Sequence, residues 1–274
     1  MDDYTEPCCC FDASQYTGTP DTSHVEHPLD IPEIIKGLDA RNNSGRESEA
    51  AAYLENWLAE ARIRKDWRAE LSLNNELLGQ YRRSGDAEKG IRTVNEVLML
   101  LKAHSLGSTV SGATILLNAA TTLKCFGRAA ESVPIFRHVA RVYADHLDPL
   151  DYRFAGLYNN MALSFADTGD YLSAEKHFTM ASGILEKCPG TENDRAVTFC
   201  NLAELYDAQD PEDPRISACM EKAWDLLNTP DLPKDGYHAF TASKCVPTFD
   251  RLGYFLYASE LQKRADVIYQ QSYL

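Results

Sequence analysis

A spacing of 42 residues recurs along the chain and constrains its fold more than any other feature. One phase of this spacing holds turn-forming residues, which are Gly85, Gly127, Gly169, Pro211 and Gly253. Two further phases hold small or apolar residues: Gly90, Ser132, Ala174, Ile216 and Ala258, and then Val97, Val139, Ala181, Ala223 and Ala265. A fixed period of this length is typical of repeat proteins, in which each repeat packs only on its neighbours.

Apolar side chains between the turns recur at helical intervals, which predicts an all-α fold of about 12 helices in 6 pairs. The predicted pairs cover residues 31–41 with 47–63, 66–83 with 86–104, 110–125 with 128–146, 150–168 with 171–187, 192–208 with 214–228, and 235–250 with 254–271. The turn glycines suit a left-handed backbone conformation. Asp30, Asp86 and Asp170 are expected to cap the helices that follow them. We therefore predict an α-solenoid over residues 29–274.

One stretch carries a family resemblance. Residues 158–174, which read Tyr-Asn-Asn-Met-Ala-Leu-Ser-Phe-Ala-Asp-Thr-Gly-Asp-Tyr-Leu-Ser-Ala, resemble a tetratricopeptide (TPR) repeat. Leu77 to Tyr81, running into Gly85, gives a second match. The common TPR period is 34 residues, and the longer period here is similar to that of kinesin light chains. The resemblance implies a right-handed superhelix whose first helices, the A helices of each pair, line a concave groove that binds peptides.

The resemblance also implies a set of groove residues. In this family an Asn one residue before the helix A core position can bond the backbone of an extended peptide, because an amide both donates and accepts hydrogen bonds. Asn118 and Asn160 occupy that position, Asn201 occupies it in a shifted register, and Asn75 lies one residue away. The alternative is that these amides face water or bond the adjacent turn.

Basic residues near the ends of two A helices form a second part of the predicted groove. Arg82, Arg83 and Lys124 could bind acidic side chains or a C-terminal carboxylate. The alternative is a solvated helix end, where cations interact favourably with the helix dipole.

The chain is acidic, with a formal net charge of −14. Residues 1–30 hold seven acidic residues and neither Lys nor Arg. Their polar composition without apolar periodicity predicts a disordered acidic tail over residues 1–28, which could gate the groove near Arg82, Arg83 and Lys124. An acidic chain is not expected to bind nucleic acid or anionic membranes, since both require a basic surface.

The cysteine pattern and the absence of catalytic motifs limit the possible location and function of the protein. The eight cysteines lack paired spacing, which favours a reducing compartment, and no secretory signal opens the chain, so we expect a cytoplasmic protein. Cys8, Cys9 and Cys10 are interpreted as exposed thiols without a specific role, with metal binding or modification as alternatives. No Walker, HExxH, GxGxxG or GxSxG motif is present, so neither a cofactor nor an enzymatic activity is expected.

These observations together favour a non-enzymatic scaffold that binds a peptide or a partner protein. A homodimer is an alternative, because no polar capping helix follows the last predicted pair. Its surface would be formed by aromatic and apolar residues of that pair: Tyr254, Phe255, Tyr257, Ile268, Tyr269 and Tyr273.

Overall fold

The computed structural model describes residues 11–43 and 47–272, and its described part contains helices and no strand. Twelve α-helices follow one short 3-10 helix, η1 (Ala13–Tyr16). They are α1 (Ile31–Asn43), α2 (Glu47–Arg64), α3 (Trp67–Ser84), α4 (Ala87–Ala103), α5 (Val110–Cys125), α6 (Ala129–His146), α7 (Arg153–Asp167), α8 (Tyr171–Leu185), α9 (Glu192–Asp207), α10 (Arg215–Leu227), α11 (Gly236–Arg251) and α12 (Phe255–Ser272). Each end lies within three residues of its predicted position, which confirms the all-α prediction.

The turns between the helices of a pair form for the predicted reason. Gly85, Gly127, Gly169 and Gly253 all have positive φ, between 71° and 87°. A Cβ at any of them would meet no neighbouring atom, so backbone conformation rather than crowding favours glycine there. The caps also form, because Asp86 accepts a hydrogen bond from the backbone N–H of Lys89 and Asp170 accepts one from Ser173.

The 42-residue spacing marks the contacts between helices. The phase Val97, Val139, Ala181, Ala223 and Ala265 is fully buried at every member. At the Gly90 phase the fit is closer still, because a Cβ on Gly90 would lie 2.4 Å from the ring of Phe126. Phe126 directly follows α5, so the glycine lets α4 approach the A helix of the next pair.

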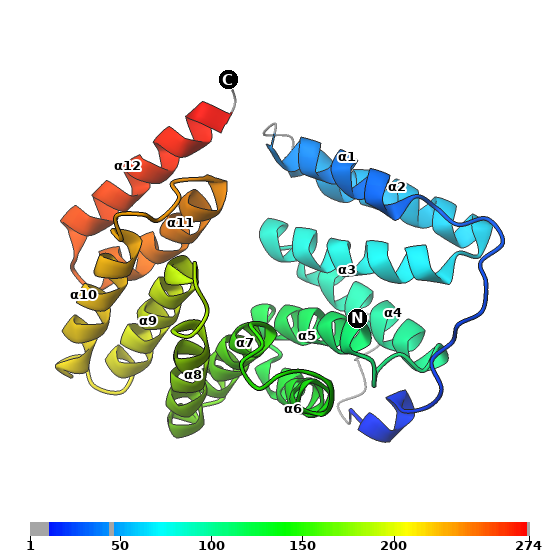
Figure 1. Ribbon diagram of the computed structural model, residues 1–274, viewed down its shortest axis with the longest axis horizontal. Coiled ribbons are helices and arrows are strands. Elements are labelled where there is room, and N and C mark those ends of the chain that lie inside the picture. The colour runs from blue at the N-terminus through cyan, green and yellow to red at the C-terminus, as the bar shows by residue number, and fades with distance from the viewer. Residues whose placement is uncertain (1–10, 44–46, 273–274) are drawn as a thin grey trace. The chain divides into compact units, whose positions relative to one another are not determined.

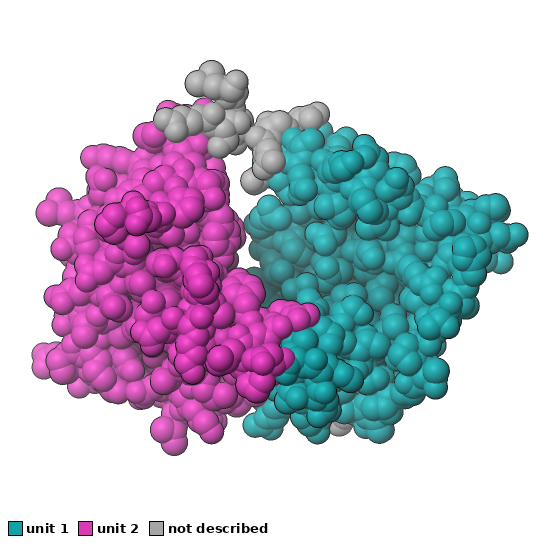
Figure 2. Space-filling view, viewed as in Figure 1, with its two compact units in different colours: residues 1–147 teal, residues 148–274 magenta. Residues whose placement is uncertain are grey.

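The helices form two compact units, residues 1–147 and residues 148–274 (Figure 2). Unit 1 contains α1 to α6 and unit 2 contains α7 to α12, so each holds three helix pairs (Figure 1). Within each unit, helix A of a pair packs on its own helix B and on the next helix A: α3 packs on α5, and α9 on α11. Consecutive pairing of this kind is the arrangement of an α-solenoid.

Residues 11–30, here called the N-terminal strap, differ from the predicted disorder of residues 1–28. Tyr16 and Val25 of the strap are both buried. Asp21 contacts His104 at the end of α4 twice, through its carboxylate at 2.7 Å and through its backbone N–H at 2.9 Å. Two isolated apolar side chains in a polar segment give no periodic signal, so the sequence pattern could not reveal this packing. Cys8, Cys9 and Cys10 lie outside the described residues.

Candidate peptide-binding surface

The side of the A helices that does not pack on B helices, here called the A face, holds the predicted groove residues. In unit 1, Asn118 of α5 donates a hydrogen bond to the side chain of Asn75 of α3, at 2.8 Å. The register shift predicted for Asn75 therefore does not separate the two amides. They join α3 to α5, and part of their hydrogen-bonding capacity is used within the protein.

Arg82 also joins these two helices. Its guanidinium donates to the backbone oxygen of Asn118 at 3.2 Å and to the hydroxyl of Thr122 at 2.7 Å. Burial lowers the pKa of the Arg82 guanidinium from its ordinary value. Arg82 is thus held as a bridge between α3 and α5, a structural role that neither sequence interpretation included.

The other two predicted cations have different surroundings. Arg83 is exposed, and among the described residues it forms no ion pair. Lys124 is half-buried and engaged with a neighbouring residue. Of the three predicted cations, Arg83 is therefore the one most accessible to an acidic ligand.

Unit 2 presents its Asn residues differently. Asn160 of α7 donates to the backbone oxygen of Gly156 one turn earlier, at 2.9 Å. Asn201 of α9 is half-buried, and its side chain has no hydrogen-bond partner among the described residues. The neighbouring Asn159 takes the bridging role, donating to the Thr198 hydroxyl of α9 at 2.9 Å. The amide oxygens and remaining donors of Asn160 and Asn201 are therefore available to a ligand.

An aromatic patch in unit 2 was not predicted from the sequence. It consists of Tyr152, Tyr237 and Phe240, which are 50%, 48% and 43% exposed, together with Asp194. The Tyr237 hydroxyl donates to the Asp194 carboxylate at 2.5 Å, which joins the first turns of α11 and α9. A signal was present in the spacing, because Asp194 follows Tyr152 by 42 residues and Tyr237 follows Asp194 by 43.

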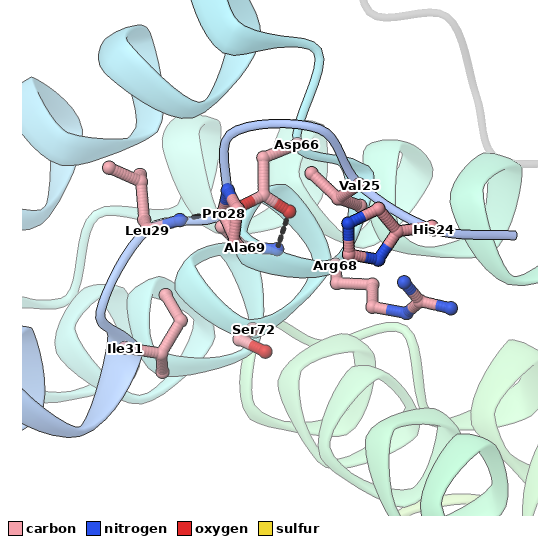
Figure 3. A pocket seen from close by; sticks show the side chains of 9 residues that line it. All are labelled: His24, Val25, Pro28, Leu29, Ile31, Asp66, Arg68, Ala69 and Ser72. Carbon is pink, nitrogen blue, oxygen red and sulfur yellow. Dashed lines mark hydrogen bonds between the residues drawn. The ribbon is translucent and has the colours of Figure 1, made fainter.

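The N-terminal strap and the start of α3 enclose a pocket of about 240 Å³ (Figure 3). Asp66 closes one side of it, accepting hydrogen bonds from the backbone N–H of Leu29 and of Ala69 (Figure 3). His24 and Arg68 also line the pocket. The strap contacts seen here involve neither Arg82 nor Arg83, so the described part of the predicted tail does not cover the cations that it was expected to gate.

The aromatics of the last pair divide into two groups. Tyr254 and Tyr257 both contact the ring of Phe249 in α11. Tyr257 also stacks on Trp224 of α10, with the ring centroids 4.0 Å apart. Phe255 and Tyr269 are exposed, Ile268 is buried, and Tyr273 lies outside the described residues. Much of the predicted dimer surface is therefore used inside unit 2.

The described part of the chain shows neither a metal-binding group nor a membrane-spanning helix. No three His, Cys, Asp or Glu side chains are grouped there so as to hold a metal ion. None of its helices combines the length and hydrophobicity needed to cross a bilayer.

Known proteins resemble this chain in structure and not in sequence. No protein-family model and no curated protein sequence matches it. BtubC (BKLC) from P. vanneervenii aligns over 89% of this chain and 92% of its own, with 17% identity and a TM-score of 0.51. Nearly identical TPR-like repeats of kinesin light chain type from Podosopora anserina align over 74% of this chain and 96% of their own, with 14% identity and a TM-score of 0.53. In its fold, the chain is a TPR-like α-solenoid repeat protein.

Proposed function

We propose that the chain is a non-enzymatic scaffold that binds a peptide or partner protein on its A face. The observation that carries this proposal is the state of Asn160 and Asn201 in unit 2. Both are half-buried, one bonds only its own helix, and the other has no partner in the described structure. Half-buried amides with spare donors and acceptors gain most from a ligand that supplies complementary groups.

An extended peptide backbone fits this chemistry. Its N–H and C=O groups alternate, and an amide side chain can satisfy one of each. In unit 1 the equivalent amides, Asn75 and Asn118, already bond each other. We therefore propose that Asn160 and Asn201 contribute more to peptide binding than Asn75 and Asn118. Within unit 1, Arg83 and Lys124 are the proposed ligand contacts.

Paired substitutions test this assignment. The variant Asn160→Ala/Asn201→Ala is expected to capture fewer partners in affinity purification followed by mass spectrometry. The matched control is Asn56→Ala, which removes an exposed amide from α2, a B helix. Partners lost from the double variant and retained by the control would support the A face. An unchanged set of partners in the double variant would overturn the assignment.

Self-association is a second candidate function. Leu256 and Phe255 at the start of α12 are 84% and 64% exposed, and Val267 on the same helix is 51% exposed. Exposed apolar side chains of this size on α12 favour contact with a second copy. Sedimentation velocity tests this: dimerisation that Leu256→Glu abolishes would support it, and a monomer at high concentration would rule it out.

We also propose that the chain is cytoplasmic and that its partner is neither nucleic acid nor membrane. Cys125, Cys188, Cys200, Cys219 and Cys245 are free thiols, which fits a reducing compartment. The acidic balance of the chain fits a protein partner better than a polyanion.

A further inference from the structure

The aromatic patch has the composition of a cation-binding surface. Tyr152, Tyr237 and Phe240 are each about half exposed; Tyr152 directly precedes α7, and the other two lie in the first turns of α11. Aromatic rings at such positions lose water-exposed apolar area when a ligand covers them. Their electron-rich faces attract Lys or Arg side chains.

A carboxylate lies among these rings. Asp194 accepts the hydroxyl of Tyr237, and Tyr152 is close enough that burial and the charge of Asp194 raise its pKa above the ordinary value. The pKa of Tyr237 is raised as well, first by burial and then by its bond to Asp194. Both phenols therefore stay neutral, and the patch presents one negative charge framed by uncharged rings.

The same patch already contains one contact of the kind proposed. Lys244, one turn after Phe240 on α11, places its ammonium 4.5 Å from the centre of the Phe240 ring. The Phe240 ring therefore already holds a cation within the protein. A cation from a partner would compete with Lys244 for this ring.

The charge of unit 2 favours a basic partner over an acidic one. Residues 148–274 hold 20 acidic and 11 basic residues, a formal net charge of −9. Residues 1–147 hold 21 acidic and 16 basic residues, a formal net charge of −5. Long-range attraction of a basic segment is therefore stronger at the unit that carries the aromatic patch.

We propose that the aromatic patch of unit 2 binds a Lys or Arg side chain from a basic peptide segment of the partner. The basic side chain lies against the rings of Tyr152 and Phe240 and pairs with Asp194. This inference rests on the proposed function, because it identifies the class of peptide that the A face of unit 2 accepts.

Fluorescence anisotropy with the full-length chain tests the proposal. The probes are labelled peptides of repeating Gly-Arg-Ser and its Lys, Gln and Glu counterparts of equal length. At physiological salt the Arg probe is expected to bind at least about tenfold more tightly than the Gln probe. Equal or tighter binding of the Glu probe would overturn the proposal.

Matched variants separate the patch from diffuse attraction to an acidic surface. Phe240→Ala and Tyr152→Ala are each expected to weaken Arg-probe binding about threefold to tenfold, and Asp194→Asn about tenfold. Tyr237→Phe keeps the ring and should retain the affinity within about twofold, while Lys244→Ala should increase it by removing the competing cation.

The controls are Phe255→Ala, an exposed aromatic on α12, and Glu221→Gln, the same change of charge on α10. Weakening by these controls as large as that by the patch variants would show nonspecific attraction and overturn the proposal.

The test of the aromatic patch can fail independently of the test of the scaffold function. If Asn160→Ala/Asn201→Ala abolishes partner capture but the Arg probe shows no preference, the scaffold function stands and the basic-peptide assignment is overturned. If patch variants weaken the Arg probe while the Asn substitutions change nothing, the patch is supported and the amides are excluded as the peptide contact.

Discussion

Units 1 and 2 have the same helical framework and different A faces. In unit 1, Asn75 bonds Asn118 and Arg82 bridges α3 to α5, so polar side chains of the A face are used to join helices. In unit 2 the A helices are joined by other residues, among them Asn159 to Thr198, Tyr237 to Asp194 and Arg251 to Asp207. Asn160, Asn201 and three aromatic rings are left facing outward. A repeat framework therefore leaves the choice of binding surface to residues outside the repeating positions.

The two units also differ in their packing with the N-terminal strap and in their net charge. Unit 1 carries the N-terminal strap, whose Tyr16 and Val25 are buried. Unit 2 carries the larger excess of acidic residues, with a net charge of −9 against −5 for unit 1. Asn75, Asn118 and Arg82 of unit 1 therefore have structural roles, and Asn160 and Asn201 of unit 2 are the amides proposed to bind a ligand.

The largest expected effect concerns the shared framework. Phe136 in unit 1 and Phe178 in unit 2 are 42 residues apart and both are almost fully buried. Because a large cavity is left in each case, Phe136→Ala and Phe178→Ala should each lower the free energy of unfolding by about 3–5 kcal/mol. Chemical denaturation measures both values. Costs that differ by more than about 2 kcal/mol would show that the repeats are not equivalent in packing.

A second prediction separates the units by their response to acid. His238 in unit 2 is fully buried and bonds Asn193 through Nδ1, and burial lowers its pKa to about 4. The unfolded chain binds this proton near the ordinary value of about 6.5. Stability is therefore complete above pH about 6.5 and falls as the pH decreases toward 4, because the unfolded state binds the proton first.

The expected loss from His238 is on the order of 1–3 kcal/mol. His138 in unit 1 also has a lowered pKa, again through burial, but its shift is smaller. Thermal melting as a function of pH should show a pH dependence between 6.5 and 4 that His238→Leu reduces. A variant with the same pH dependence as the unmodified chain would contradict the assignment to His238.

A third prediction compares two arginines at the ends of A helices. Arg82 is half-buried and bonds across to α5, so Arg82→Ala should cost about 1–2 kcal/mol of stability. Arg251 is exposed and pairs with Asp207 at 2.6 Å, so Arg251→Ala should cost about 0–1 kcal/mol. Urea denaturation of the two variants checks this order. A larger loss of stability for Arg251→Ala than for Arg82→Ala would contradict the structural role assigned to Arg82.

The smallest expected effect concerns the N-terminal strap. Its described contacts lie on His104, Asp66 and Lys102 and not on Arg82 or Arg83. Deleting residues 1–28 should therefore change partner affinity by less than about twofold while lowering the stability of unit 1. Isothermal titration of the partner against both forms of the chain gives the comparison. Clearly tighter binding by the truncated form would restore the gating hypothesis.

Sequence periodicity predicted the framework because its signals are local. Left-handed Gly85 and Gly169, and the caps at Asp86 and Asp170, depend on neighbouring residues only. The strap and the A face depend on contacts between distant segments. Asp21 lies 83 residues from His104, and Tyr237 lies 43 from Asp194, so local patterns do not show which partner each residue meets.

The Asn positions illustrate the same limit within the candidate site. Repeat register places Asn118 and Asn160 at equivalent positions, 42 residues apart. One bonds an amide of the preceding repeat and the other bonds its own helix. Asn118 meets Asn75 of α3, a neighbour that the repeat pattern does not define.

Site-specific photo-crosslinking tests the central claim, that the A face of unit 2 binds the partner, most directly. A photoreactive amino acid is placed at Asn201 or Phe240 on the A helices, and at Leu172 or Leu256 on the B helices α8 and α12. We predict crosslinks to the bound partner from Asn201 and Phe240, with little or none from Leu172 and Leu256. Crosslinks that form only from the two B-helix positions would contradict the account.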